Sequence, residues 1–344
     1  MVYSNQLMEQ IEKEIQRETS RLHEKLGRLN WSKADCELIA PLTLEINRLK
    51  KEKNAIILAH SYQTPDIKYG VADFIGDSYG LSKKAMESKA DTIVFCSVHF
   101  MAETAKILNP EKTVLVPAVA GCSLSESITA KDVKDLRKKY PEAAVVCYIN
   151  TTAAVKAESD ACCTSSNSLK VLETVKRKEI IFIPDELMGK NLQPLTKKKV
   201  HLWSGRCIVH EMFTAEMIGS MREEFPDIKV LAHSECKPEV IAVSDMMGGT
   251  DAMLKYVAKS SAKRFMLVTE CGLTDRAKVE FPDKEFLGTC TLCPYMKKIM
   301  LKDVLQALQK PRPSQVIKLP EDTIKKALRT VVRMVKITEK QVMD

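Results

Sequence analysis

The chain has 344 residues, of which 45% are apolar, 28% charged and 6% aromatic, the composition of a soluble globular protein. This composition excludes a low-complexity disordered chain, a collagen and a coiled-coil rod. At about 100–200 residues per domain, the length predicts two or three domains. No apolar run approaches the roughly 20 residues of a bilayer span, and no signal-peptide stretch follows Met1, so we expect a cytoplasmic protein.

The net charge of +8 is concentrated near the C-terminus, because residues 294–344 carry 12 Lys and Arg against 5 Asp and Glu. Such a segment can bind nucleic acid or an anionic small molecule, or can simply form a solvated helix face. No aromatic RNA-binding motif, finger spacing or Arg-rich arm accompanies it. We therefore expect neither nucleic acid nor a membrane as a partner.

Residues 1–50 are predicted to form leading helices. Apolar residues recur there at helical spacing: Leu7, Ile11, Ile15, Leu22, Leu26 and Leu29. The stripe within residues 1–34 is interpreted as a packing or dimer face.

An internal repeat organises the rest of the chain. Short apolar runs at residues 55–62, 144–150 and 229–235 each end in two polar residues spaced i, i+2. Matching residues then follow at nearly equal offsets in each copy: Asp73, Asp160 and Asp245; Ser78, Ser165 and Thr250; Ile93, Ile181 and Met266; Val114, Val200 and Phe286; Cys122, Cys207 and Cys293. Five offsets in register over three copies indicate a threefold repeat.

Each copy predicts strand, helix, strand, helix, strand, and the continuous apolar runs are typical of buried parallel strands. The predicted fold is α/β, with three homologous small αβα sandwich units whose parallel sheets surround a central active site in a pseudo-threefold arrangement. The expected division is N-terminal helices at 1–50, repeats at 51–124, 125–209 and 210–293, and basic C-terminal helices at 294–344 that pack back on the fold. Two helices are expected in this last segment, broken at residues 311–313.

Ligands of parallel α/β units bind at the carboxyl ends of the strands, where the polar pairs lie. An i, i+2 spacing directs both side chains of a pair to one face. The three pairs, His60 with Tyr62, Tyr148 with Asn150, and His233 with Glu235, are therefore predicted to converge on one pocket. Capping of the strand-to-helix turns is the alternative.

The repeated hydroxyls of Ser78, Ser165 and Thr250 each precede a predicted helix, so they are candidates both for N-caps and for phosphate or carboxylate binding. The repeated aspartates are interpreted as structural groups that bond turn backbone in each copy.

Among 11 Cys, an odd number, a disulfide framework is not expected, and most should be reduced core thiols. Cys122, Cys207 and Cys293 would meet on the pseudo-axis. Three thiolates from one chain bind zinc or an iron–sulfur cluster, and a catalytic pocket favours the cluster because one iron is then left open. Cys290, in a C-x-x-C with Cys293, is read as a spare thiol.

From about Asp35 to the C-terminus the chain resembles the quinolinate synthase family, the A proteins of bacterial-type NAD biosynthesis. The motifs that carry the resemblance are Ala59-His-Ser-Tyr-Gln63, Ala72-Asp-Phe-Ile-Gly-Asp-Ser78, His99-Phe-Met-Ala-Glu-Thr104, Ala120-Gly-Cys122, Tyr148-Ile-Asn-Thr151, Thr164-Ser-Ser-Asn167, Trp203-Ser-Gly-Arg-Cys-Ile-Val-His210, His233-Ser-Glu-Cys236 and Cys293-Pro-Tyr-Met-Lys297.

The resemblance implies a transferase that forms carbon–carbon bonds and dehydrates, condensing iminoaspartate with dihydroxyacetone phosphate to quinolinate, phosphate and two waters. It implies a [4Fe-4S] cluster on Cys122, Cys207 and Cys293, and an L-aspartate oxidase or aspartate dehydrogenase as the supplier of iminoaspartate. The matching substrate-site residues are His60, Tyr62, Ser78, Tyr148, Asn150, Ser165, His233, Glu235 and Thr250.

Roles follow from this resemblance and from the chemistry of the residue types. Glu235 with His233 would be the general acid–base pair, and Tyr62 a second proton-transfer group. His60 would orient the triose or its product, while Tyr148, Asn150, Ser165 and Thr250 would hold carboxylates and phosphate. Two departures from the family pattern fall in the site, Ser234 in place of Pro and Gly249 in place of Ser.

Three rival functions share parts of this pattern. They are another three-Cys iron–sulfur enzyme on the same three-unit plan, such as the diphthamide-forming proteins; a cluster-bearing sensor or nucleic-acid partner; and a zinc-binding structural protein.

Overall fold

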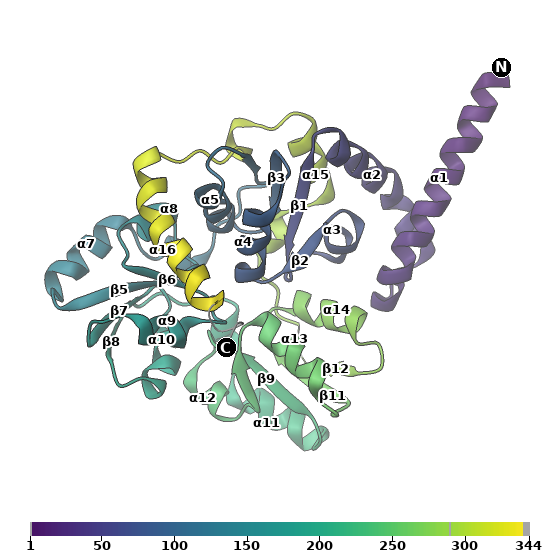
Figure 1. Cartoon of the computed structure of the whole chain (residues 1–344). Helices are drawn as coiled ribbons and strands as arrows, with labels where there is room; N and C mark the ends of the chain where they lie inside the picture. The colour runs from purple at the N-terminus through teal and green to yellow at the C-terminus, as the bar shows by residue number, and fades with distance from the viewer. Residues whose placement is uncertain (1, 289, 340–344) are drawn as a thin grey trace.

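The computed structural model describes residues 2–288 and 290–339. It contains three four-stranded parallel sheets, each with helices on both faces, arranged around a common centre (Figure 1). The α/β class and the three αβα units predicted from the sequence are therefore confirmed. None of the helices in the described ranges combines the length and apolar character of a membrane span.

The first sheet has the order β2-β1-β3-β4 and the other two repeat it, as β6-β5-β7-β8 and β10-β9-β11-β12. The strand bounds are β1 (Ala55–His60), β2 (Phe74–Gly76), β3 (Thr92–Cys96), β4 (Thr113–Leu115), β5 (Ala143–Tyr148), β6 (Ala161–Cys163), β7 (Glu179–Ile183), β8 (Lys199–Leu202), β9 (Lys229–His233), β10 (Met246–Gly248), β11 (Arg264–Val268) and β12 (Glu285–Leu287).

Four strands in each unit correct the prediction of three. The additional strands, β2, β6 and β10, have three residues each, too few to show any hydrophobic period. Each pairs in parallel with the central strand of its sheet, so that Gly76 lies opposite His60, Cys163 opposite Tyr148 and Gly248 opposite His233.

The helices of the three units join consecutive strands. In the first unit they are α3 (Pro65–Gly70), α4 (Ser78–Glu87), α5 (His99–Leu108) and α6 (Ser123–Glu126). In the second they are α7 (Ala130–Lys139), α8 (Ala153–Ala157), α9 (Ser168–Thr174), α10 (Glu186–Leu192) and η2 (Gln193–Leu195). In the third they are η3 (His210–Met212), α11 (Ala215–Glu224), α12 (Pro238–Ala242), α13 (Thr250–Lys259) and α14 (Cys271–Glu280).

Flanking helices begin and end the chain. At the N-terminus α1 (Val2–Leu26) and η1 (Gly27–Leu29) precede α2 (Lys33–Glu52). At the C-terminus η4 (Met296–Lys298), α15 (Leu301–Gln309), η5 (Pro313–Gln315) and α16 (Glu321–Glu339) pack back on the fold, α15 against α2 and α16 against α8, α5 and β6. The expected break between two C-terminal helices is present.

One repeated aspartate holds the short strand of each unit in register. Asp73 accepts a hydrogen bond on Oδ2 from the backbone N–H of Ile57 at 2.8 Å, and its own N–H donates to the Ile57 carbonyl at 2.9 Å. The Asp160–Val145 and Asp245–Val230 pairs repeat both bonds. These aspartates are structural, as the sequence predicted, and they fix where each strand that leads to the site begins.

The backbone carbonyl one residue beyond β1, β5 and β9 also accepts a hydrogen bond in all three units. Its donor is a buried side-chain nitrogen: Lys68 Nζ to Ser61 at 3.1 Å, Lys156 Nζ to Ile149 at 2.8 Å, and Asn191 Nδ2 to Ser234 at 3.0 Å. A buried carbonyl without a donor costs free energy, so these bonds stabilise the corner at which the site residues sit.

A buried side chain of one unit bonds the backbone of another at each junction. Glu103 accepts from the Ala153 N–H at 2.8 Å between the first and second units. Asn191 reaches from the second unit to the third, and Lys68 of the first unit donates to the Gly272 carbonyl of the third at 2.6 Å. The three units are thus joined into a closed ring.

We predict that Lys68 makes the stability of the protein depend on pH. Burial lowers the pKa of Lys68 to about 7, whereas its ordinary value is 10.5. Between these values the unfolded chain binds a proton that the folded chain has released, so the free energy of unfolding should rise with pH. Denaturant unfolding of Lys68→Met at pH values from 7 to 10 should lack this rise. The exposed Lys131, changed to Met, is the control and should keep it; equal slopes in both variants would refute the assignment.

Candidate functional site

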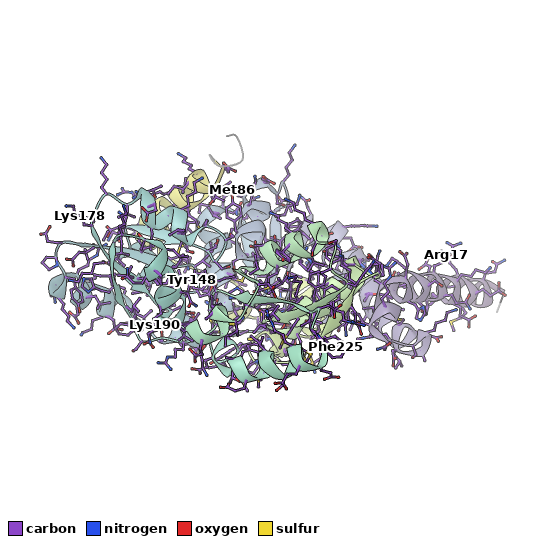
Figure 2. All side chains as sticks on the ribbon, turned by 90° about the horizontal axis from the view of Figure 1, so that it is seen from below. Arg17, Met86, Tyr148, Lys178, Lys190 and Phe225 are labelled. Carbon is purple, nitrogen blue, oxygen red and sulfur yellow. A yellow bond between two sulfur atoms is a disulfide. The ribbon has the colours of Figure 1, made fainter. Side chains whose placement is uncertain are left out.

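A cavity lies where the three units meet. All twelve residues predicted for the site line it: His60, Tyr62, Ser78, Tyr148, Asn150, Ser165, His233, Glu235, Thr250, Cys122, Cys207 and Cys293. Tyr148 lies in the middle of the molecule when it is viewed from below (Figure 2). The sequence therefore predicted which residues the fold would bring together.

The two histidines at strand ends share one arrangement. His60 Nδ1 accepts the backbone N–H of Tyr62 at 3.2 Å, and His233 Nδ1 accepts that of Glu235 at 3.3 Å. Burial lowers the pKa of each histidine to about 3, so both imidazoles are neutral. Because Nδ1 is the acceptor, the proton is on Nε2, and each ring can donate one hydrogen bond to a bound ligand.

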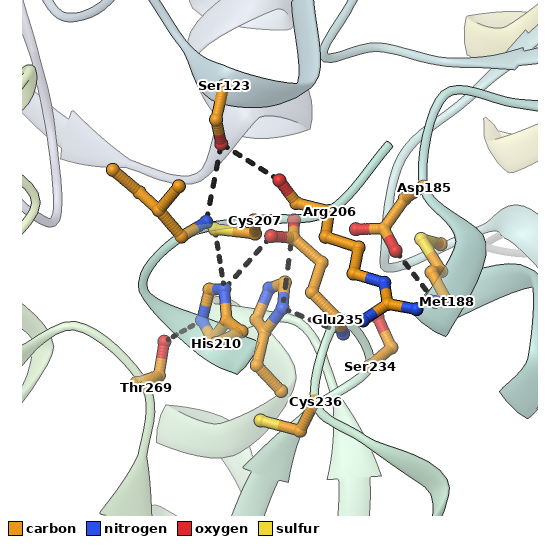
Figure 3. A network of polar contacts seen from close by, with 12 residues as sticks. Ser123, Asp185, Met188, Arg206, Cys207, His210, Ser234, Glu235, Cys236 and Thr269 are labelled. Carbon is orange, nitrogen blue, oxygen red and sulfur yellow. Dashed lines mark hydrogen bonds and ion pairs between the residues drawn. The ribbon is translucent and has the colours of Figure 1, made fainter. Parts of the chain in front are cut away.

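Glu235 is the centre of the polar network in Figure 3. Its Oε1 accepts from the Tyr148 hydroxyl at 2.5 Å, and its Oε2 lies 2.9 Å from His210 Nδ1. Burial raises the pKa of Glu235. The imidazoles of His210 and His233 and the two hydrogen bonds lower it by more, so that the pKa of this carboxyl lies below its usual range. Glu235 is therefore a buried carboxylate that remains ionised.

The network continues from His210 to the opposite side of the cavity. His210 Nε2 lies 2.8 Å from the Thr269 hydroxyl, which lies 2.6 Å from the Tyr62 hydroxyl. With His210 as the Nδ1–H tautomer, the bonds run in one direction, from Tyr62 through Thr269 and His210 to Glu235. Tyr62 and Tyr148, from different units, are thus connected by a continuous series of hydrogen bonds.

The three predicted cysteine ligands have matching surroundings. Each follows the last strand of its sheet and begins a short helical turn whose N–H groups two and three residues on lower the pKa of the thiol: Leu124 and Ser125 for Cys122, Val209 and His210 for Cys207, Tyr295 and Met296 for Cys293. Burial outweighs this and raises the pKa of all three thiols, that of Cys122 to about 12. A metal that displaces the protons would find each sulfur already facing N–H donors.

The structure also groups Cys207, His210 and Glu235, whose ligand atoms lie within 4.8 Å of one another. This group could hold a single metal ion with N, O and S ligands. However, His210 and Glu235 are already hydrogen-bonded to each other. His210 also bonds Thr269, and Glu235 also bonds Tyr148, so a metal ion bound there would break this network.

The repeated hydroxyls are not helix caps, which corrects one of the two readings. Asp77 and Gly249 occupy the N-cap positions of α4 and α13, so Ser78 and Thr250 are the first residues inside these helices. Among the described atoms, the buried Thr250 Oγ1 has no hydrogen-bond partner. A Cβ atom at position 249 would lie only 2.4 Å from Ser165 Oγ. Glycine at this position therefore avoids a clash with the Ser165 hydroxyl.

Cys290 is not a spare thiol, because its sulfur is bonded to that of Cys271 in a disulfide. This corrects the expectation that Cys290 is unpaired. Repeat spacing could not predict the pair, because neither residue recurs in the repeat.

Two further residues of this polar network, His210 and Thr269, were not predicted from the repeat. His210 lay inside a recognised motif but had no counterpart in the other copies. Thr269 follows the end of β11, as Ser97 follows β3 and Pro184 follows β7, so only two of the three copies have a hydroxyl at this position. Repeat spacing finds only positions at which the copies agree.

The fold and the cavity define the class: an α/β protein of three parallel-sheet units around a buried polar site with three cysteines. The chain belongs to the family described as Quinolinate synthetase A protein, whose model matches residues 44–336. Quinolinate synthase 1 of Mesorhizobium japonicum is 50% identical over 290 residues, covering 84% of this chain and 89% of the relative. Quinolinate synthases of Xylella fastidiosa (51% over 268 residues; 78% and 79% covered) and Caulobacter vibrioides (46% over 300 residues; 86% and 82%) are also similar.

We predict that the cysteine set, rather than the Cys207–His210–Glu235 group, binds metal. In anaerobically purified protein, Cys122→Ser, Cys207→Ser and Cys293→Ser should each lose most of the bound metal, while His210→Ala should retain it. Elemental analysis per chain measures both results. Cys36→Ser, a buried thiol among the N-terminal helices, is the control. Full metal in Cys122→Ser and Cys293→Ser, with loss in His210→Ala, would assign the other group.

Proposed function

We propose that the protein is a quinolinate synthase, which condenses iminoaspartate with dihydroxyacetone phosphate to give quinolinate, phosphate and two waters in NAD biosynthesis. The observation that carries the proposal is the convergence of nine substrate-site candidates and three cysteines on one buried cavity. The supplier of iminoaspartate would be an oxidase or dehydrogenase that acts on L-aspartate.

Cys122, Cys207 and Cys293 would hold a [4Fe-4S] cluster. The donor set fits this group, since three thiols in matching turns, each facing N–H donors, come from three units and border the same cavity. When bound, such a cluster supplies a Lewis-acidic iron for a carboxylate or hydroxyl of the substrate.

Glu235 is suited to remove protons, because its ionised carboxylate is buried and its position is fixed by Tyr148 and His210. Imine formation, isomerisation and loss of water each move a proton, and a positioned carboxylate serves these steps as general base and then as acid. Because the hydrogen bonds run from Tyr62 to Glu235, a proton that enters at Tyr62 can pass through Thr269 and His210 and restore the proton that a protonated Glu235 has given to the substrate.

The remaining polar groups bind and orient anionic substrates. Neutral His60 and His233 each offer one Nε2–H to a carbonyl or carboxylate oxygen. The hydroxyls of Ser78 and Thr250 lie at the N-termini of ten-residue helices, where free N–H groups and the helix dipole favour phosphate or carboxylate. Asn150 and Ser165 complete this polar wall.

The test of the proposed function is product formation. Anaerobically purified protein with reconstituted iron and sulfide, given iminoaspartate and dihydroxyacetone phosphate, should form quinolinate, and exposure to air should abolish this activity. Quinolinate is measured by chromatography and mass spectrometry, with protein lacking iron as the control. Absence of product from protein that carries four irons and four sulfides would reject this substrate pair and favour another enzyme on the same three-unit plan.

We predict that Glu235→Gln keeps the cluster but loses turnover by at least about 100-fold, since general acid–base catalysis contributes factors of this size. Gln retains an oxygen for the Tyr148 hydroxyl but cannot take a proton. Visible absorption reports the cluster and initial rates report turnover. The exposed Glu239, changed to Gln, should behave as the unmodified protein. A rate within threefold of the unmodified enzyme for Glu235→Gln would remove this residue from the acid–base role.

A further inference from the structure

The turns that carry Cys122 and Cys207 are bonded to each other. Ser123 Oγ donates to the Arg206 carbonyl at 3.0 Å and accepts the Ile208 N–H at 3.3 Å, so that one hydroxyl links the two turns (Figure 3). The positions of these two cysteines relative to each other are therefore fixed by a direct contact.

The turn of Cys293, residues 293–297, is attached in another way. Its one hydrogen bond to the other two turns, within the described ranges, joins the Tyr295 hydroxyl to Glu126 at 3.3 Å and is exposed to solvent. Inside the protein, the fully buried Glu270 accepts the Cys293 backbone N–H on Oε1 at 3.2 Å. The same oxygen lies 2.8 Å from Lys297 Nζ. One carboxylate thus binds both ends of the turn and fixes the Cys293 sulfur between them.

Lys297 extends this attachment to the substrate side of the cavity. Its Nζ also donates to the Tyr62 carbonyl, and Gln63 Nε2 donates to the Met296 carbonyl at 3.2 Å. The end of the turn is therefore bonded to the corner that follows β1, whose Tyr62 side chain lines the cavity. Cys293 and Tyr62 depend on the same set of bonds for their positions.

The contact is so close that it requires a glycine. Glu270 Oε2 accepts the Gly272 N–H at 2.7 Å, and a Cβ atom at position 272 would lie only 2.8 Å from Tyr62 Cα. A side chain there would push the backbone of the first unit away from the third. Glu270 therefore lies in a tightly packed junction that leaves little freedom to the groups around it.

Glu270 and Lys297 also depend on each other for charge compensation. Glu270 is not exposed at all and the Lys297 side chain is only 20% exposed. Removing one member of a buried ion pair leaves an uncompensated charge, which is strongly unfavourable. Loss of either residue should therefore displace the bonds that both of them make to the Cys293 turn.

The other two units have no equivalent of this carboxylate. Val98 and Asp185 occupy the position of Glu270, since all three residues are N-caps of the helices that follow β3, β7 and β11. Val98 has no polar side-chain atom, and Asp185 accepts the Met188 N–H of its own helix at 2.9 Å. The attachment through Glu270 is thus particular to Cys293, the cysteine whose turn lacks a buried bond to the other two.

We propose that Glu270 and Lys297 are positioning residues, which hold Cys293 in place for the cluster and in register with Tyr62. The inference rests on the proposed role of Cys293 as a cluster ligand. Neither residue lines the cavity, so both act through the groups they bond and not on the substrate. Groups that orient metal ligands in this way typically change metal affinity by 10–100-fold when they are removed.

The test is the rate at which iron leaves anaerobically reconstituted protein in an excess of a ferrous-iron chelator, followed by the absorbance of the chelate. Glu270→Ala and Lys297→Met should each release iron at least about 10-fold faster than the unmodified protein. Glu270→Gln retains an oxygen for the Cys293 N–H and should release iron more slowly than Glu270→Ala. Adding Glu270→Gln to Lys297→Met removes the uncompensated charge, so the double variant should release iron more slowly than Lys297→Met alone.

Lys50→Met is the matched control. The Lys50 side chain is 13% exposed, pairs with Asp73 at 2.8 Å and donates to the Val71 carbonyl at 2.9 Å, so its surroundings resemble those of Lys297 without a cysteine turn. Its iron should leave at the rate of the unmodified protein. An equal acceleration in Lys50→Met and Lys297→Met would assign the effect to general destabilisation and overturn the proposal.

Cys293→Ser, measured in the same series, distinguishes the positioning role from the ligand on which it rests. If this variant loses iron while Glu270→Ala and Lys297→Met release it at the unmodified rate, the positioning role is wrong and the ligand stands. Full iron in Cys293→Ser would reject the ligand and the positioning role together. Should Glu270→Ala fail to fold, the comparison of Lys297→Met with its double variant decides the question, and equal rates in those two would count against the ion pair.

Discussion

The buried carboxylate of Glu235 is the interaction on which the centre of the molecule depends. A charge removed from water is costly unless other groups compensate it. Here compensation comes from Tyr148 of the second unit and from His210 in η3, at the start of the third unit. The carboxylate is stable only when the units are docked, so formation of the site and assembly of the ring are one event.

The ring in turn depends on a few buried bonds that cross between units. Lys68, Asn191 and Glu103 each form a hydrogen bond with the backbone of a neighbouring unit. Lys68 and Asn191 also donate to the carbonyls that follow β1 and β9. The same side chains therefore set the distance between units and the direction of the strand ends. A change in docking would move His60 and Glu235 relative to each other.

Repeat spacing predicted what the three copies have in common. It found the central strands, the register-holding aspartates and the three cysteines, because a periodic fold places equal offsets at equivalent positions. It missed β2, β6 and β10, which are too short to show a period, and it could not decide between cap and ligand for Ser78 and Thr250. The choice depends on whether the first helical residue is the hydroxyl residue itself or the one after it, and only the backbone conformation of the structure shows this.

The residues that spacing could not find are those at which the copies differ. His210 has no counterpart, Thr269 matches a hydroxyl in only one other copy, and the Cys271–Cys290 bond joins two positions that do not repeat. In the third unit, the position equivalent to Lys68 and Lys156 is Ile241, and Asn191 from the second unit supplies the missing donor. Such substitutions leave no periodic signal, although the contact they make is equivalent.

This division between equal and unequal positions corresponds to two chemical tasks. A group bound on the pseudo-axis by three thiols requires the same residue from each unit, and Cys122, Cys207 and Cys293 are identical with identical N–H surroundings. An asymmetric substrate requires a different group from each unit, and the strand ends supply neutral imidazole, phenol, amide and carboxylate. The symmetry of the fold therefore builds the set of three cysteines proposed to hold the cofactor, whereas its local violations build the polar groups proposed to bind the substrates.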